Sequence, residues 1–374
     1  MHISSAFDSG NIVVLDGQRP EDVTLEIRPD AGEDHFQWFH FRVTGARDTP
    51  LRLRIVNAAR VSYPDGWTNY RACASYDRED WFRVNTRWDG KELTIEHTPE
   101  LDSVYYAYFA PYSHERHGDL LAAAQCEPGV SLERLGASVD GRDLDLLRLG
   151  EPADGQRSCW IIARQHPGET MAQWLVEGLL ERLLDDDDAI ARWLRARATF
   201  YVVPNMNPDG SARGHLRNNA AGANLNREWQ TPSMERSPEV FLVRERMQTT
   251  GVDFFLDVHG DEALPYNFIA GPEGIPSWSD ATAARQRLYT DALLNLSPDF
   301  QTTHGYPPAK PGEANMTMAS NWVGEAFGCL SMTLEQPFKD TADTPHPQGW
   351  SPERARQLGY AQLGALRVVF DALR

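Results

Sequence analysis

The feature that most constrains this chain is a change of sequence pattern near residue 110. Before it, short runs of branched and aromatic residues are separated by turn-forming clusters such as DSGN, TGARD and WDGK, which is typical of consecutive short strands. After it, strand-like runs alternate with amphipathic helices, as in an α/β domain. The sequence therefore predicts a β-sandwich domain at residues 1–111 and an α/β domain at residues 112–374.

The first region is predicted to be a small antiparallel β-sandwich. Its clearest strand contains LRLRI at 51–55, in which apolar and charged residues alternate with the period of two expected when one face is wet. Short strands with frequent turns and no long helix favour a sandwich. The predicted strands are 12–15, 23–27, 36–43, 51–56, 93–97 and 105–110.

A group of aromatic residues in the first region admits two interpretations. Aromatic side chains supply much of a hydrophobic core when buried, and an exposed set could instead form a platform for carbohydrate. Packing is the favoured interpretation, and a carbohydrate platform is the alternative. The residues concerned are Trp38, Phe39, Phe41, Trp67, Trp81 and Trp88.

The second region alternates strands and helices. A stripe of apolar residues that begins at Met171 recurs at helical spacing. The acidic run 185–188 lacks the glycine and glutamate of a calcium-binding loop and is predicted to be a solvated turn and helix cap. Alternation of this kind predicts a mostly parallel or mixed sheet with helices on both faces. Further strands are predicted at 158–163, 199–203, 252–258 and 329–335, and further helices at 238–248, 281–296 and 352–373.

Charge and cysteine content argue against several classes of partner and site. The 374 residues include 36 Lys and Arg against 54 Asp and Glu, and the net charge of −18 argues against duplex nucleic acid and anionic membranes as partners. Four scattered cysteines without a CxxC pair argue against a disulfide framework or a thiolate zinc site. No apolar run could span a bilayer and no signal-peptide pattern is present, so a cytoplasmic protein is predicted. The oligomeric state stays open.

Candidate metal ligands occur first in HPGE at 166–169. The imidazole of His166 and the carboxylate of Glu169 can converge on one cation where a loop turns into a helix, and such nitrogen and oxygen ligands suit Zn²⁺. Glu169 has a second interpretation, because the helix dipole favours an acid in the first turn.

A second histidine completes a set of three candidate ligands. His259 directly follows an apolar strand, and α/β sheets gather their ligands at the carboxyl ends of strands. Together with His166 and Glu169 it would leave a fourth metal position open for water, which is the pattern of a catalytic zinc site.

Glu335 ends another apolar strand and should reach the same edge of the sheet. A carboxylate there can accept a proton from water and pass it to a leaving amine, whereas the alternative is an ordinary surface glutamate. Arg217, Asn226 and Arg227 lie between the candidate ligands in the sequence. Guanidinium groups near a metal suit an anionic substrate end and a developing oxyanion.

Taken in order, five motifs resemble the zinc carboxypeptidases, and among them the cytosolic carboxypeptidase branch. An aromatic stretch at 106–113 and the opening FDSGN at 7–11 look similar to that branch as well. The resemblance implies a carboxypeptidase-like α/β/α catalytic domain with a mixed sheet, preceded by a β-sandwich domain. The five motifs are HPGE (166–169), NPDG (207–210), GANLNREW (222–229), DVHG (257–260) and LEQP (334–337).

The resemblance implies that His166, Glu169 and His259 bind zinc, with one ion per chain. The chain departs from the family at the position two before the Asn-Arg pair, where an acidic residue usually supports the first zinc histidine. Here that position is Asn224. An amide oxygen can accept the imidazole N–H but gives less electrostatic support, so looser zinc binding is predicted.

The resemblance also implies roles for the residues that handle the substrate. Glu335 would be the general acid and base, and Arg217 would polarise the scissile carbonyl and stabilise the oxyanion. Asn226 and Arg227 would hold the C-terminal carboxylate of a peptide or protein.

Two features of the substrate pocket stay open. Tyr306 is the nearest candidate for the tyrosine that closes over the substrate in digestive relatives. Lys310 could form the basic floor of a pocket for an acidic residue, but a solvated loop lysine is the favoured interpretation.

The favoured function is a metallocarboxypeptidase that hydrolyses the C-terminal peptide or isopeptide bond of peptides and proteins. The alternative is a zinc-dependent N-acyl amino-acid deacylase that resembles the aspartoacylase group, which shares the ligand pattern. A third hypothesis is a non-catalytic protein that binds peptides or glycans.

Overall fold

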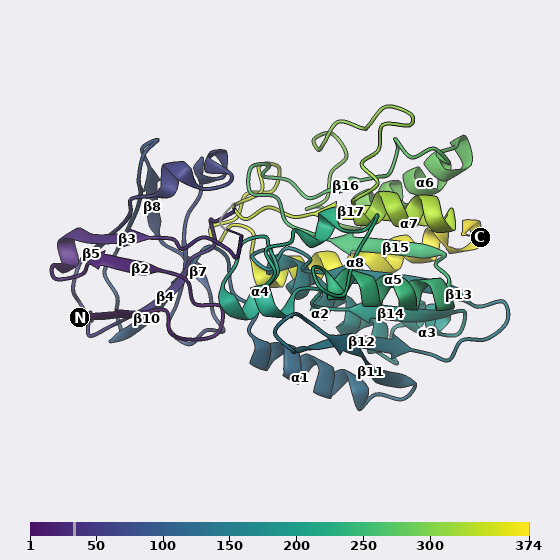
Figure 1. Ribbon diagram of the computed structural model, residues 1–374, viewed down its shortest axis with the longest axis horizontal. Coiled ribbons are helices and arrows are strands. Elements are labelled where there is room, and N and C mark those ends of the chain that lie inside the picture. Colours follow the sequence, from purple (N-terminus) through teal and green to yellow (C-terminus); the bar gives the residue numbers. More distant parts are fainter. Residues whose placement is uncertain (33–34, 374) are drawn as a thin grey trace.

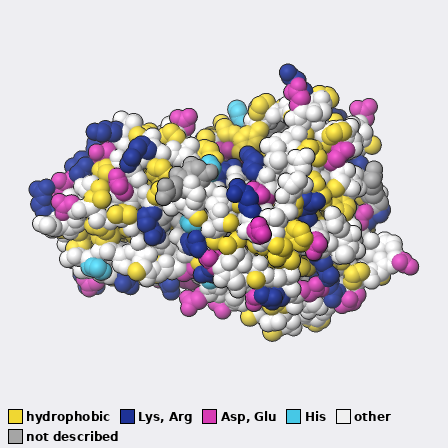
Figure 2. Space-filling view, in the orientation of Figure 1, with side chains coloured by type: hydrophobic (Ala, Val, Ile, Leu, Met, Phe, Trp, Pro, Cys, Tyr) yellow, Lys and Arg dark blue, Asp and Glu magenta, His cyan; other side chains and the backbone are white. Residues whose placement is uncertain are grey.

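The computed structural model describes residues 1–32 and 35–373, which form two lobes side by side (Figure 1). The N-terminal lobe is built from strands, and the larger lobe combines a sheet with helices. On the face shown in Figure 2, basic and acidic side chains are interspersed over both lobes. Within the described residues, no helix is both long and apolar enough to cross a membrane.

Two five-stranded sheets make up the N-terminal lobe, as the strand pattern predicts. Inward-facing residues of both sheets belong to one hydrophobic core, and all strand pairs are antiparallel except β3 with β5. One sheet has the order β1 (His2–Ser4), β4 (His40–Thr44), β10 (Ser103–Ala107), β6 (Cys73–Ser75) and β7 (Phe82–Arg83). The other has the order β2 (Val13–Asp16), β3 (Val23–Glu26), β5 (Leu51–Ile55), β9 (Leu93–His97) and β8 (Asn85–Trp88).

The aromatic residues of this lobe form its core. Trp38, Phe39, Phe41 and Trp67 are each at most 1% exposed, and two further tryptophans, Trp81 and Trp88, pack partly buried against the same core. This burial confirms the packing interpretation of the aromatic group, because a carbohydrate platform requires exposed rings.

The larger lobe contains one seven-stranded mixed sheet. Its central strands β14, β13, β15 and β17 are parallel, and β11, β12 and β16 are antiparallel to their neighbours. The order across the sheet is β11 (Val130–Ala137), β12 (Asp143–Leu149), β14 (Ala198–Val203), β13 (Arg157–Ala163), β15 (Phe254–Val258), β17 (Leu330–Glu335) and β16 (Phe268–Ala270).

Helices cover both faces of this sheet, as predicted. Alternate residues of β13 face different cores: Ile161 joins the core that contains α2 and α8, and Ile162 joins the core that contains α5 and α7. Helices α2 and α8 approach closely at two glycines, since a Cβ on Gly178 or Gly359 would lie within 2.3 Å of the other helix. The helices are α1 (His114–Gln125), α2 (Met171–Leu184), α3 (Ala189–Arg195), α4 (Pro208–Arg213), α5 (Pro238–Thr250), α6 (Asp280–Leu296), α7 (Ala319–Phe327) and α8 (Pro352–Val369).

The acidic run before α3 acts as a helix cap. The side chain of Asp188 accepts a hydrogen bond from the amide of Ala191 in the first turn of α3. Asp185 and Asp186 lie in the turn between α2 and α3. The cap interpretation of this run is therefore confirmed.

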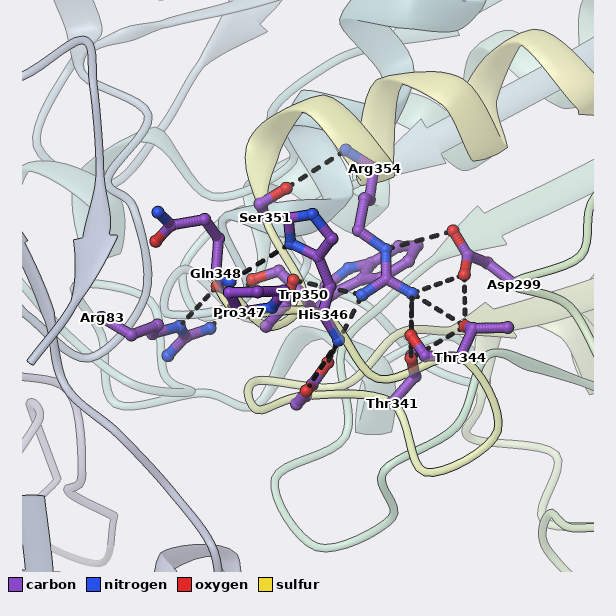
Figure 3. Close-up of polar contacts among 12 residues, drawn as sticks. Arg83, Asp299, Thr341, Thr344, His346, Pro347, Gln348, Trp350, Ser351 and Arg354 are labelled. Atoms are coloured by element: carbon purple, nitrogen blue, oxygen red, sulfur yellow. Dashed lines mark hydrogen bonds and ion pairs between the residues drawn. The ribbon is translucent and has the colours of Figure 1, made fainter.

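Arg83, in β7, joins the N-terminal lobe to the segment that follows β17. Its guanidinium donates to the carbonyl oxygens of Phe338 and Trp350, each at 2.9 Å, and to that of Gln348 at 3.4 Å. Figure 3 shows Arg83 reaching this segment while Arg354 of α8 donates to Thr341 and to the carbonyl oxygen of Thr344 within it, each at 2.9 Å. The loop after Glu335 is thus fixed from both lobes.

Candidate active site

Three parallel strands bring the predicted site residues to one edge of the sheet. Ala163 at the end of β13 is in register with Val258 of β15, which is in register with Leu334 of β17. His259 and Glu335 therefore lie side by side at the carboxyl ends of β15 and β17, where α/β sheets gather ligands. His166 follows β13 at the same edge.

The three predicted metal ligands are in mutual contact and buried. The Nδ1 atom of His166 lies 2.7 Å from Oε1 of Glu169, and the Nδ1 atom of His259 lies 2.7 Å from Oε2 of the same carboxylate. The two Nδ1 atoms are 3.2 Å apart, and all candidate ligand atoms lie within 4.8 Å of one another. Two imidazoles and one carboxylate on such a small centre fit a zinc ion.

Each histidine is oriented through its outer nitrogen, but by a different partner. Nε2 of His166 is 3.0 Å from Oδ1 of Asn224, and Nε2 of His259 is 2.9 Å from Oδ2 of Asp257. An acceptor at Nε2 keeps the proton there and leaves the Nδ1 lone pair for a metal. The predicted contact between Asn224 and His166 is present. The partner of His166 is thus an amide, whereas the partner of His259 is a carboxylate.

The two histidines consequently differ in electrostatic environment. Burial, with a contribution from the charge of Arg217, lowers the pKa of His166 to about 3. Burial also disfavours the charged form of His259, but the carboxylates of Asp257 and Glu169 outweigh it and raise the pKa well above its usual range. His166 is therefore a candidate ligand whose neutral form is favoured, with an amide rather than a carboxylate behind its Nε2 atom.

Glu335 is the last residue of β17 and is buried beside the ligands. Burial raises the pKa of its carboxyl well above the usual range, and the nearby charges of Glu169, Asp261 and Glu262 add to this effect. Within the described part of the chain, its Oε2 atom is buried without a hydrogen-bond partner. A carboxyl group with a free oxygen and a high pKa is suited to accept and release a proton.

Arg217 enters the site from the loop that follows α4. The NPDG motif forms the start of this helix, where Asn207 caps the amide of Gly210 and donates to the carbonyl oxygen of Gln165, next to His166. The guanidinium of the half-buried Arg217 lies over the ring of Tyr63, 5.6 Å from its centroid. Its pKa is raised by surrounding negative charge, although burial opposes this.

Asn226 lies next to His259, and Arg227 directly follows it. Nδ2 of Asn226 is 3.4 Å from Nε2 of His259, and its Oδ1 accepts from the amide of Ala319 at the start of α7. Arg227 donates to the carbonyl oxygen of Asn226 at 2.7 Å, and burial together with the charge of Arg217 lowers the pKa of Arg227. The two predicted carboxylate-binding residues are thus adjacent to the ligand cluster.

Several residues of the site were not predicted from the sequence. Asp257 carried a usable signal, because it lies two residues before His259 and residues i and i+2 of a strand share a face. Glu262 gave no such signal; burial raises the pKa of its carboxyl to about 8. The unpredicted residues are Tyr63, Gln165, Asp257, Asp261 and Glu262.

The two open positions of the substrate pocket have different surroundings. The hydroxyl of Tyr306 donates to Asp261, which places this half-exposed tyrosine at the rim of the site. Lys310 is exposed in the loop that follows. The solvated interpretation of Lys310 therefore agrees with its position, and a capping role for Tyr306 stays a prediction.

Comparison with known proteins identifies the family. The model of the zinc carboxypeptidase family matches residues 120–355, and that of the cytosolic carboxypeptidase N-terminal domain matches residues 3–109. The chain belongs to the zinc carboxypeptidases. The boundary predicted between residues 111 and 112 falls between the two matched ranges and stays a prediction.

Solved structures of similar chains agree with this assignment. A metallo-carboxypeptidase from Burkholderia cenocepacia is 51% identical, with 99% of each chain covered and a TM-score of 0.97. A metallo-carboxypeptidase from Pseudomonas aeruginosa, in complex with (2-guanidinoethylmercapto)succinic acid, is 48% identical, with 100% of each chain covered and a TM-score of 0.97. Cytosolic carboxypeptidase 6 of Caenorhabditis elegans is 27% identical over 89% of this chain and 78% of the relative.

These similarities show that the protein is a metallocarboxypeptidase. They do not favour the N-acyl amino-acid deacylase that the ligand pattern alone left open. The family acts on peptides or proteins and implies zinc.

Proposed function

We propose that the protein removes the C-terminal residue of peptides or proteins by hydrolysis at the edge formed by β13, β15 and β17. The observation that carries this proposal is the convergence of His166, Glu169 and His259 beside Glu335, whose buried Oε2 atom has no hydrogen-bond partner among the described residues. Three ligands with a free acid next to them suit a hydrolytic centre better than a structural metal site.

His166, Glu169 and His259 would hold one zinc ion per chain. The chemistry of the donors supports this assignment, since all three are nitrogen or oxygen ligands and both histidines present Nδ1 to the shared centre. A bound zinc ion supplies Lewis acidity, which makes a carbonyl carbon more electrophilic and water more acidic.

Glu335 moves the proton in the proposed reaction. Its carboxylate accepts a proton from the attacking water and delivers it to the nitrogen of the departing amino acid. The new bond joins the water oxygen to the carbonyl carbon, and the bond that breaks is the C–N bond of the last peptide unit. The buried position of Glu335 keeps its proton affinity high enough for this exchange.

Three cationic or amide side chains handle the negative charges of the substrate. Arg217 donates to the carbonyl oxygen as it gains charge, and this interaction is strongest in the transition state. Arg227 and Asn226 hold the terminal carboxylate, for which a guanidinium fork has matching geometry. A free C-terminal carboxylate is therefore a condition for cleavage.

The ligand of the Pseudomonas aeruginosa relative fits this arrangement. Its name specifies a succinic acid, which carries two carboxyl groups, and a guanidino group. Carboxyl groups suit the zinc and arginine side of the site in this chain. The buried acids Asp261 and Glu262 lie close to Glu335, and an approaching cation would favour the charged form of Glu262, so these acids would suit a basic side chain at the cleaved residue.

Mass spectrometry of a small peptide panel tests the proposal. Peptides that end in Lys, Glu, Leu or Phe, each with a free and an amidated C-terminus, are incubated with the zinc-loaded protein. We expect loss of one C-terminal residue from free peptides and no cleavage of the amidated ones. Release of acyl groups from N-acetyl amino acids, without any peptide cleavage, would contradict the proposal.

A further inference from the structure

We propose that Asp30, in the N-terminal lobe, is a positioning residue for Arg217, so that the first lobe completes the active site of the second. This inference rests on the proposed function and adds a role for the N-terminal lobe. Asp30 precedes the first predicted site residue by more than a hundred positions and follows β3 in a loop.

The carboxylate of Asp30 binds the backbone on both sides of Arg217. Its Oδ1 accepts from the amide of Leu216 at 2.7 Å, and its Oδ2 accepts from the amides of Arg217 at 2.7 Å and Asn218 at 2.9 Å. Asp30 is only 3% exposed. Charge-assisted hydrogen bonds in a buried site are strong, so three of them fix this short stretch of backbone.

A second set of contacts holds the same loop at its edges. The amide of Ala31 donates to Nε2 of His215 at 3.3 Å, and the side chain of Asn218 donates to the carbonyl oxygen of Ala31 at 3.1 Å. At the end of α4, the side chain of Asn11 donates to the carbonyl oxygen of Gly214 at 2.8 Å. The opening FDSGN motif thus packs against the helix end that leads into the arginine loop.

The N-terminal lobe also contacts the far end of the Arg217 side chain. The ring of Tyr63 lies against the guanidinium, and Gln37 fixes Tyr63 through two hydrogen bonds to its backbone, at 2.9 and 3.1 Å. A long arginine side chain loses much conformational freedom when it is ordered. Asp30 at the backbone and Tyr63 at the guanidinium pre-order it before the substrate arrives.

Asp30 does not lie among the residues proposed to touch the substrate, so its effect on catalysis would pass through Arg217. A donor aimed at a developing oxyanion must be held in place before the reaction, because small displacements weaken it. Loosening the loop should therefore lower kcat more than it changes KM. A residue that merely joined the lobes would lower stability instead.

Steady-state kinetics of Asp30→Asn test the inference. The substitution keeps the shape but replaces one acceptor oxygen with a donor that faces backbone amides. We expect kcat to fall about 10- to 100-fold and KM to change less than about threefold, with the zinc content unchanged. The matched control is Asn57→Ala, which removes two hydrogen bonds to the backbone of Ile27 elsewhere in the lobe. It should lower stability and leave kcat within about twofold.

A double-mutant cycle then separates positioning from general damage. Arg217→Met alone should lower kcat by on the order of a hundredfold. In that background Asp30→Asn should change kcat by less than about twofold, because Asp30 has no arginine left to position. Independent losses that multiply, or a wild-type kcat for Asp30→Asn, would overturn the inference.

Two further outcomes keep the proposals apart. If the wild-type protein cleaves peptides and Arg217→Met does not, while Asp30→Asn is fully active, the positioning role alone fails. If the wild-type protein cleaves no peptide, the proposed function fails and the inference falls with it. Should Asp30→Asn not fold, Asn218→Ala loosens the same loop from the other side, and an unchanged kcat of that variant overturns the inference.

Discussion

The two halves of the active site are held in place by different means. The metal half, defined as His166, Glu169, His259 and Glu335, lies at the ends of neighbouring parallel strands in a single sheet. The arginine half, defined as Arg217 and its loop 214–219, is also held by the other lobe, which binds the Arg217 backbone through Asp30 and meets its guanidinium through Tyr63. Strand register places the first half, and contact between the lobes places the second.

This difference means that metal binding and transition-state stabilisation can be lost separately. A change in strands β13, β15 or β17 disturbs the ligands directly. A change in the N-terminal lobe is expected to leave the candidate ligands in place and to displace Arg217, the group proposed to meet the oxyanion. The N-terminal lobe is therefore expected to matter for turnover more than for zinc content.

Glu335→Gln should give the largest effect on turnover. Within the metal half, it should separate proton transfer from zinc binding. The amide keeps the size of the side chain but cannot accept and pass on a proton, so kcat is expected to fall about 10²- to 10⁴-fold. Zinc content by elemental analysis should match that of the wild type, because Glu335 is not among the three ligands. Glu325→Gln, an acid outside the site, serves as the control. Substantial turnover by Glu335→Gln would remove this residue from its role.

Asn224→Asp should give a smaller effect, which is a change in zinc affinity that acts through His166 alone. A carboxylate behind His166 would make the imidazole more basic, and zinc affinity is expected to rise about tenfold. The reciprocal change, Asp257→Asn behind His259, should weaken zinc binding by a similar factor. Zinc retention against a competing chelator measures both. Equal retention in Asn224→Asp and wild type would show that the two histidines do not differ in support.

Glu239→Gln should have the smallest effect on turnover, and it tests how far the arginine half depends on its own lobe. Glu239 of α5 accepts from the side chain of Asn219 at 3.2 Å, and burial raises the pKa of its carboxyl to about 7 from 4.5. Between these two pH values the folded state binds more protons than the unfolded state. The wild type therefore loses stability as the pH rises through this window.

The glutamine variant lacks this titration. Between pH 4.5 and pH 8, its stability relative to wild type should increase by on the order of 3 kcal/mol. Urea unfolding at several pH values measures the difference, and kcat is expected to stay within about twofold. A pH-independent difference would show that Glu239 is not protonated in the folded protein, and a large loss of kcat would extend the support of Arg217 to α5.

The sequence predicts the metal half better than the arginine half, for a physical reason. HPGE and DVHG each place a candidate ligand within three residues of the end of an apolar strand, and parallel strands end at a common edge. The local sequence pattern is therefore enough to predict where most residues of the metal half lie. Asp257 could have been added by the same strand periodicity.

No local sequence pattern comparable to these motifs predicts that Asp30 holds Arg217 in place. Asp30 and Arg217 are 187 positions apart, and Asp30 lies in a loop, where neither a period of two nor one of 3.6 applies. The same limit affects the fold: strands of five or more residues were largely predicted, whereas three-residue β1 and β6 are too short to show a period. Strands β11 and β12 were missed although DLDL in β12 alternates polar and apolar residues as LRLRI does, so a usable signal was present there.

The most direct test of the metal half is an anomalous difference map from a zinc-soaked crystal, with data collected on both sides of the zinc absorption edge. We expect one strong peak per chain between Nδ1 of His166, Nδ1 of His259 and the carboxylate of Glu169. A zinc peak elsewhere in the chain, with none at these three residues, would contradict the assignment of the site.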